Sequence, residues 1–330
     1  MYNVANLFNS KNPDVFIVAE IGINHGGSFD FAKKLVYSAK ESGADAVKFQ
    51  IFKTEKFYNQ KILKENFDLF KSLELTFDQF SRLKELSDSL DMVFFATPLD
   101  TDSLDFLIAI NTPIIKIASS DISCEPFLFE ISKKAEKYKK AVFMSTGFVK
   151  MDVIKKAVSF FQNTDIALLY CVSKYPASSD DIDLNVIKSF KENFLMPVGF
   201  SDHTLNYIFS VGAVALGAKI IEKHFTTDNS LPGLDHLISL NPERFKTMVT
   251  SIREIEKALK TGEKSITKFE EDISGLSMRE MYFSRDMKKG EKIKAEDILF
   301  LRPGTGVSLR KFRSRLNKKL KEDKLMYEKV

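Results

Sequence analysis

Cysteine is scarce in this chain, and long apolar runs are missing from it. The two cysteines, Cys124 and Cys171, do not form a Cys-x-x-Cys pair. Disulfide frameworks need more cysteines and redox or zinc motifs space them closely, so we expect two reduced thiols. No run reaches about 18 consecutive apolar residues, and the first residues lack a basic start followed by an apolar core. We therefore expect a cytoplasmic protein with no membrane partner.

The net charge of +4 does not extend over the whole chain. Residues 309–330 carry nine Lys and Arg against three Asp and Glu, and the rest of the chain is slightly negative. A basic tail can bind nucleic acid, but apolar residues alternate with the charges of this tail. These apolar residues are Leu309, Phe312, Leu316, Leu320 and Leu325. The pattern favours a folded amphipathic segment, and we expect no nucleic-acid partner.

Short apolar runs alternate with helical patterns along most of the chain. Eight such runs occupy residues 15–22, 46–50, 92–98, 114–119, 141–147, 166–171, 197–202 and 218–225. Helical periodicity fills the intervals, for example at 29–43, 77–91 and 151–162. Nearly continuous apolar runs are typical of parallel strands buried on both faces. Eight strand and helix units therefore predict an α/β fold of the (β/α)8 TIM-barrel class.

A doubly wound open sheet is the alternative fold. It would place a Gly-x-Gly-x-x-Gly phosphate loop after an early strand. The first predicted strand continues into GINHGGS, which does not match that pattern. The barrel is the better interpretation.

The sequence predicts two domains. Residues 242–262 have the pattern of a last barrel helix, so that the barrel covers 1–263, and residues 264–277 form a polar linker. Residues 278–330 combine short strands with turns at Lys289-Gly290 and Pro303-Gly304, which predicts a small β-rich domain. A domain of this size builds little core of its own, so we expect it to pack on a barrel.

Polar residues gather at the carboxyl ends of the predicted strands. The active sites of TIM barrels lie at this end, so polar side chains there carry particular weight. They are Glu20, Asn24, His25, Lys48, Gln50, Thr97, Lys116, Ser119, Asp121, Ser145, Thr146, Ser173, Tyr175, Ser201, Asp202, His203, Glu222 and His224. The pattern predicts an active site built from all eight strands.

Two of the four histidines follow neighbouring strands. His203 and His224 end strands seven and eight, so their side chains can converge on one ion. Neutral imidazole is the commonest ligand of a catalytic divalent metal. The pair therefore predicts a metal site with positions left open for substrate and water. Two hydrogen-bonded structural histidines are the alternative.

Two lysines lie within apolar strands. An unpaired ammonium at Lys48 or Lys116 would be costly to bury, so we expect both side chains to face an anion. Serines at the neighbouring strand ends could share a phosphate or carboxylate with them. A Schiff base on one of these lysines is a second hypothesis.

These motifs resemble the sialic acid synthase family, which includes legionaminic and pseudaminic acid synthases. The matching motifs are AEIGINHGGS, GADAVKFQ, ATPLDTDSLDFL, KIASSDI, STG, CVSKYP, GFSDHT, VALGAKIIEKHFT and PGLDH, and KKGEKIKAEDILFLRPGTG resembles the family's antifreeze-like (SAF) module. The resemblance implies a transferase that condenses phosphoenolpyruvate, an N-acylmannosamine-type sugar and water to a sialic acid and phosphate. It also implies bound Mn²⁺ or Mg²⁺ and a domain-swapped homodimer.

The resemblance carries roles to individual residues. His203 and His224 correspond to the metal ligands, and Arg302 to an arginine that reaches a partner subunit's sugar site. The phosphoenolpyruvate pocket corresponds to Lys48, Thr97, Lys116, Ser119, Ser145, Ser173 and Ser201. The residues that correspond to the sugar site are Glu20, Gln50, Tyr175, Glu222 and Asp235. Asp121, Glu20, Lys48 and Lys116 are the expected catalytic groups, with Asp121 activating water.

Two departures concern the substrate. Asp121 stands where many members have Glu, and Ser173 stands where some have Asn. Within the same family, the alternative is a legionaminic or pseudaminic acid synthase that uses a 2,4-diacetamido-2,4,6-trideoxy hexose. A catalytically inactive carbohydrate-binding relative is a third, although the intact lysines and histidines argue against it.

Overall fold

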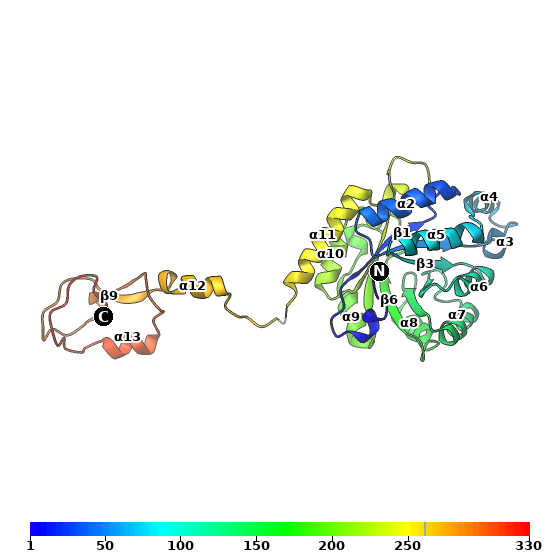
Figure 1. The fold of residues 1–330 in the computed structure, drawn as a ribbon. Coiled ribbons are helices and arrows are strands. Elements are labelled where there is room, and N and C mark those ends of the chain that lie inside the picture. The colour runs from blue at the N-terminus through cyan, green and yellow to red at the C-terminus, as the bar shows by residue number, and fades with distance from the viewer. Residues whose placement is uncertain (261) are drawn as a thin grey trace. The chain divides into compact units, whose positions relative to one another are not determined.

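The computed structural model describes residues 1–260 and 262–330, which form two compact units, Met1–Leu259 and Lys260–Val330 (Figure 1). The predicted last barrel helix, 242–262, includes residue 261, which lies outside the described residues. Across the two described ranges, no helix combines the length and the apolar character that a membrane crossing requires.

Eight parallel strands close into a barrel in the first unit. They are β1 (Phe16–Gly22), β2 (Ala46–Ile51), β3 (Val93–Pro98), β4 (Ile114–Ile117), β5 (Ala141–Ser145), β6 (Ile166–Cys171), β7 (Val198–Asp202) and β8 (Ile220–His224). Each strand pairs with its sequence neighbours, and β8 pairs with β1 to close the ring. The predicted (β/α)8 barrel is confirmed, and the doubly wound alternative is wrong.

Helices surround this barrel, as Figure 1 shows. The α-helices of this unit are α1 (Asn6–Asn9), α2 (Phe29–Glu41), α3 (Thr54–Phe57), α4 (Lys64–Leu73), α5 (Phe77–Ser89), α6 (Thr101–Ala109), α7 (Glu125–Tyr138), α8 (Met151–Val158), α9 (Asn185–Asn193), α10 (Ile208–Ala215) and α11 (Pro242–Ala258). Several begin at side-chain caps, among them Ser28, Asp100 and Asn241. These caps satisfy amide groups that the first turn leaves free.

Inward-facing side chains change from apolar to polar along each strand. In β1, Phe16 and Val18 belong to an apolar cluster inside the barrel, and Glu20 follows two residues later. In β4, Ile114 belongs to the same cluster and Lys116 follows. Side chains two residues apart share a face, so the amino-terminal half of the interior is apolar and the carboxyl-terminal half is polar. The apolar half stabilises the barrel, and the polar half is available for a site.

The second unit is a small β-rich structure in which one α-helix precedes the two strands and another follows them. Its elements are α12 (Lys268–Ser277), β9 (Glu280–Phe283), β10 (Ile298–Leu301) and α13 (Leu309–Arg315), and β9 pairs antiparallel with β10. Its core contains Met281, Phe283, Met287, Ile293 and Ile298. Phe312, Leu316 and Leu320 of the basic tail pack against this core, as an amphipathic segment should, whereas Leu325 is exposed.

Part of the predicted linker is helical. Residues 264–277 were expected to be a polar linker, but Lys268–Ser277 form α12. A capping box begins this helix, since Thr267 Oγ1 accepts a hydrogen bond from the Glu270 backbone amide at 3.2 Å and Glu270 accepts one from the Thr267 amide at 2.8 Å. The Thr-x-x-Glu spacing is a helix-start signal that the polar composition obscured.

The apolar half of the barrel interior should contribute to stability. Phe95 is fully buried and its ring lies 5.7 Å from that of Phe143. We expect Phe95→Ala to lower the free energy of unfolding by about 3–5 kcal/mol, because it leaves a cavity in a closed interior. Urea unfolding measures this. Leu195→Ala, at a fully exposed position, is the control and should change stability by less than about 0.5 kcal/mol. Equal losses of stability in the two variants would contradict the conclusion that Phe95 packs in the barrel interior.

Candidate active site

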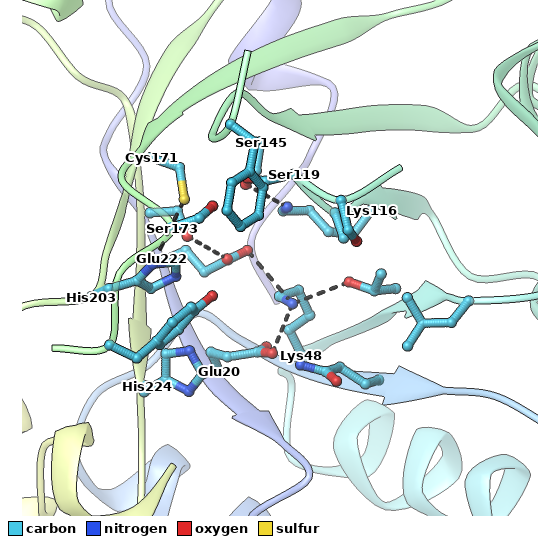
Figure 2. A pocket seen from close by; sticks show the side chains of 18 of the residues that line it. Glu20, Lys48, Lys116, Ser119, Ser145, Cys171, Ser173, His203, Glu222 and His224 are labelled. Atoms are coloured by element: carbon cyan, nitrogen blue, oxygen red, sulfur yellow. Dashed lines mark hydrogen bonds and ion pairs between the residues drawn. The ribbon is translucent and has the colours of Figure 1, made fainter. Parts of the chain in front are cut away.

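One pocket at the carboxyl ends of the strands collects most of the predicted side chains (Figure 2). Those lining it are Glu20, Lys48, Gln50, Thr97, Lys116, Ser119, Ser145, Ser173, Tyr175, Ser201, His203, Glu222 and His224. The strand register accounts for this convergence. Glu20 lies opposite both Lys48 and His224, and Ser201 lies opposite Glu222.

Lys48 is paired with carboxylates of the protein itself. Its Nζ lies 2.8 Å from Glu20 Oε1 and 3.9 Å from Glu222 Oε2, and it donates to Thr97 Oγ1 at 3.2 Å (Figure 2). Burial lowers the pKa of Lys48, but the two carboxylates outweigh burial and hold that pKa above its ordinary value. Lys48 therefore faces anions that the protein itself supplies, in Glu20 and Glu222. Its charge is balanced before any ligand binds.

Lys116 has no such carboxylate. Its Nζ donates to Ser145 Oγ at 2.6 Å and to the Ile117 carbonyl at 3.0 Å, and its side chain is almost completely buried. Over residues 1–260 and 262–330, no carboxylate oxygen lies within 4.0 Å of this nitrogen. Burial lowers the pKa of Lys116. This ammonium would gain from an anion, and a lowered pKa also suits the amine of a Schiff base.

Gly147 brings two hydroxyls together beside Lys116. A Cβ at Gly147 would lie 2.1 Å from Ser173 Oγ and 2.8 Å from Ser119 Oγ, so only glycine permits this approach. The Gly147 amide also donates to Ser119 Oγ at 3.0 Å. Lys116, Ser119, Ser145 and Ser173 thus form one group, which we call the Lys116 cluster. Its donors suit a phosphate or a carboxylate.

The two histidines lie close together. Their ring centroids are 5.5 Å apart, and both side chains are 6% exposed. His203 Nδ1 lies 2.8 Å from the Val172 carbonyl, so a proton there would leave Nε2 free to coordinate. His224 Nδ1 has no hydrogen-bond partner, and burial holds the pKa of His224 well below its usual range. Burial lowers the pKa of His203, but Cys171 and the Val172 carbonyl outweigh burial and raise that pKa above its ordinary value. The His224 imidazole, and the His203 imidazole once it is deprotonated, have nitrogens that fit a divalent metal.

His203 and His224 supply two ligands, so a divalent metal bound to them would need further donors. In the part of the chain that the structure describes, no group of three or more His, Cys, Asp or Glu side chains has metal-binding geometry. A metal held by His203 and His224 would therefore keep several positions for water or substrate. Tyr175 covers this side of the pocket, since its ring stacks on His203 with the centroids 4.1 Å apart.

A second group of polar side chains meets at Gly22. The backbone there has a φ of 54°, and a Cβ would lie 3.1 Å from Glu20 Oε1, 3.5 Å from Gln50 Nε2 and 3.7 Å from Asp235 Oδ2. Asp235 does not line the pocket, but its Oδ2 is 3.7 Å from His224 Nδ1. Burial raises the pKa of Glu20 to about 7, although Lys48 acts in the opposite direction. Glu20, Gln50 and Asp235 form the Gly22 cluster.

Several predicted residues lie outside the pocket wall, among them Asp121, Arg302 and His25. Asp121 follows β4 and is not part of the pocket wall, although its Oδ2 is buried without a hydrogen-bond partner. Arg302 belongs to the second unit and is exposed there. His25 packs against Phe49 and Phe80, with ring centroids 6.1 and 6.4 Å away. His25 is therefore a core residue and does not extend the polar site.

The sequence did not reveal the apolar part of the pocket wall. This part contains Phe57, Phe70, Leu99 and Phe148. Phe57 and Phe70 come from α3 and α4, an insertion between β2 and α5 whose many aromatic residues were the available signal. Phe148 has a φ of 65° and a largely exposed side chain. A non-glycine residue in this conformation is strained, as residues at functional sites often are.

Comparisons with known proteins identify the relatives of this chain. Residues 35–264 match the NeuB family. The N,N'-diacetyllegionaminic acid synthase of Legionella pneumophila is 40% identical over 312 residues, 89% of this chain and 86% of that protein. The Campylobacter jejuni enzyme of the same name is 35% identical, covering 94% and 98%. The crystal structure of N-acetylneuraminic acid synthetase from Leptospira borgpetersenii has a TM-score of 0.74 at 37% identity, covering 79% and 90%.

The buried carboxyl of Asp121 should make stability depend on pH. Burial raises its pKa to about 6, against the opposing charge of Lys116. Between about pH 4 and this value the folded chain holds a proton that the unfolded chain has lost, so the Asp121 contribution to stability falls as the pH rises. Above about pH 6 the Asp121 carboxyl is ionised in both the folded and the unfolded chain, so the destabilisation caused by its burial no longer changes with pH.

The asparagine of the Asp121→Asn variant cannot titrate, so this variant should not lose stability through residue 121 as the pH rises. The free energy of unfolding of the variant minus that of the wild type should rise across the pH window and then level off. Urea unfolding at a series of pH values measures the difference. A difference that stays flat across the window would contradict a raised pKa, and an NMR titration of the carboxyl carbon would measure it directly.

Proposed function

The chain belongs to the NeuB family of sialic acid synthase-type enzymes, and we propose that it condenses phosphoenolpyruvate with an N-acylmannosamine-type sugar and water. The products would be a nonulosonic acid and phosphate. One observation supports this reaction above the others. Among the described residues, the buried Lys116 ammonium has hydroxyl and carbonyl partners and no carboxylate within 4.0 Å, and it shares the pocket with His203 and His224.

The Lys116 cluster would hold phosphoenolpyruvate. Phosphate and carboxylate oxygens would accept hydrogen bonds from Lys116, Ser119, Ser145 and Ser173. Lys48 lies between this cluster and the histidines, where its charge would also act on the substrate. Ser201 donates to Glu222 at 2.8 Å, so its part would be to orient that carboxylate as well as to contact the ligand. Thr97 would orient Lys48.

We propose that His203 and His224 hold Mn²⁺ or Mg²⁺. When bound, such a metal acts as a Lewis acid toward an aldehyde oxygen. The Gly22 cluster, with Tyr175 and Glu222, would bind the open-chain sugar beside it. We also propose that the second unit is an antifreeze-like module and that Arg302 of a second subunit completes the sugar site, in a domain-swapped homodimer.

The residues would direct two proton transfers. C3 of phosphoenolpyruvate forms a bond to the aldehyde carbon, and the aldehyde oxygen takes a proton, for which Glu20 with its pKa of about 7 is suited. Water then adds to C2, which has become electron-poor, and Asp121 accepts the proton that this water loses. Cleavage of the bond between C2 and the phosphate oxygen then releases phosphate, and the leaving phosphate takes the proton that the C2 hydroxyl loses as the keto group forms. Lys48 and Lys116 would stabilise the phosphate charge throughout.

Removal of a histidine should stop the reaction. We expect His203→Ala to reduce phosphate release from phosphoenolpyruvate plus sugar by about 100-fold or more, because Lewis-acid stabilisation amounts to several kcal/mol. A chelator should have the same effect on the wild type. Lys116→Met is the comparison variant and should raise the KM for phosphoenolpyruvate while leaving Mn²⁺ affinity unchanged. Near-normal turnover without metal, together with borohydride trapping of a lysine, would instead support the Schiff-base mechanism.

A legionaminic acid synthase is the second candidate. Two legionaminic acid synthases align with most of this chain, and the pocket wall includes Phe57, Phe70, Leu99 and Phe148. Apolar side chains suit a 6-deoxy sugar with a second acetamido methyl group better than a sugar with more hydroxyls.

A panel of sugars distinguishes the two candidates. For the second candidate, 2,4-diacetamido-2,4,6-trideoxymannose should have a kcat/KM at least about tenfold above that of N-acetylmannosamine. Mass spectrometry of the products identifies the acid that forms. The reverse preference would establish the N-acetylneuraminate activity, and product from neither sugar would refute both.

A further inference from the structure

A buried ion pair lies on the outer side of the strands that carry the two histidines. Asp202 ends β7, and Lys223 lies opposite it in β8. Lys223 Nζ is 3.1 Å from Asp202 Oδ1, and both side chains are completely buried. Each residue immediately precedes a histidine of the site. Neither side chain lines the pocket.

Every polar atom of this pair has a partner. Lys223 Nζ contacts Asp202, donates to the Thr204 carbonyl, and donates to the Asn206 carbonyl at 3.1 Å, which uses all three ammonium protons. Asp202 Oδ1 accepts from the Thr204 amide at 2.9 Å, and Oδ2 accepts from Ser210 Oγ at 2.6 Å. The pair therefore joins β8 to the turn that follows β7.

This turn carries His203. β7 ends at Asp202, so regular strand pairing to β8 does not extend to His203. The backbone after His203 is held instead by Asp202 at the Thr204 amide and by Lys223 at the Thr204 and Asn206 carbonyls. On the other side, the Ala177 amide donates to the His203 carbonyl at 3.0 Å. Since His224 is the next residue after Lys223, one ion pair contacts the backbone beside both histidines.

Stability alone does not account for this pair. Buried ion pairs seldom stabilise a fold more than apolar side chains of similar size, because desolvation offsets the attraction. We propose that Asp202 and Lys223 are positioning residues, which set the separation of the two imidazoles and thereby the affinity for a divalent metal. This inference rests on the proposed metal role of His203 and His224.

The test measures metal affinity without turnover. Mn²⁺ binding to the full chain, followed by electron paramagnetic resonance, gives a Kd for the wild type and for the double variant Asp202→Asn/Lys223→Met. The double substitution removes both charges and leaves no buried charge unpaired. We expect the Kd to rise about 10- to 100-fold, the range for loss of groups that orient metal ligands.

Two further variants separate positioning from general destabilisation. Asp45→Asn breaks another ion pair of the barrel, in which Asp45 lies 2.7 Å from Arg253 and outside the pocket, and should leave the Kd unchanged. Ser210→Ala removes only the hydrogen bond to Asp202 Oδ2 and should raise the Kd about threefold or more, even if the double variant does not fold.

The outcomes distinguish this inference from the proposed function. A wild-type Kd in the double variant, or in Ser210→Ala if the double variant does not fold, would overturn the positioning role while the metal site stands. An equal rise in Asp45→Asn would also overturn it. Failure of the wild type to bind Mn²⁺, or equal binding by His203→Ala, would instead refute the metal role in the proposed function.

Discussion

The contact between Lys48 and Glu20 is the interaction on which the rest of the pocket depends. A closed barrel turns every second side chain inward, so charged residues near the strand ends have little access to water. Glu20 and Glu222 balance the Lys48 ammonium, and the polar half of the interior can therefore be buried at an acceptable cost. Because this charge is already balanced, Lys116 remains the basic group with capacity for an incoming anion.

Lys48 and Lys116 therefore have different roles, although each is the third residue of its strand. Lys48 is held between two carboxylates and a threonine, so its ammonium is maintained with or without ligand. Lys116 donates to a hydroxyl and a carbonyl, and the more distant Glu222 only partly offsets burial, so the pKa of Lys116 stays below its ordinary value. A pocket with one permanent and one ligand-dependent charge favours anionic substrates without presenting a large positive surface.

Glycines decide which side chains can meet. Gly147 lets Ser119 and Ser173 approach each other beside Lys116, and Gly22 adopts the positive φ that places the backbone next to Glu20, Gln50 and Asp235. The Ser-Thr-Gly motif at residues 145–147 is too short to indicate a function by itself. In the structure its glycine matters because a Cβ at Gly147 would clash with the hydroxyls of Ser119 and Ser173. Asp202 and Lys223 also lie within sequence motifs, but those motifs do not reveal that the two side chains form a buried ion pair. Both features depend on contacts between different strands.

The sequence by itself determined the barrel, because apolar runs and helical periods are local patterns that recur in each of the eight units. It also determined which polar residues end the strands, since all parallel strands of a barrel open at the same end. Only the tertiary structure decided how those residues pair, that Lys48 has carboxylate partners and Lys116 has none, and that His25 lies in the core. The reason is physical, because pairing and burial depend on distances between strands, which no local pattern along the chain encodes.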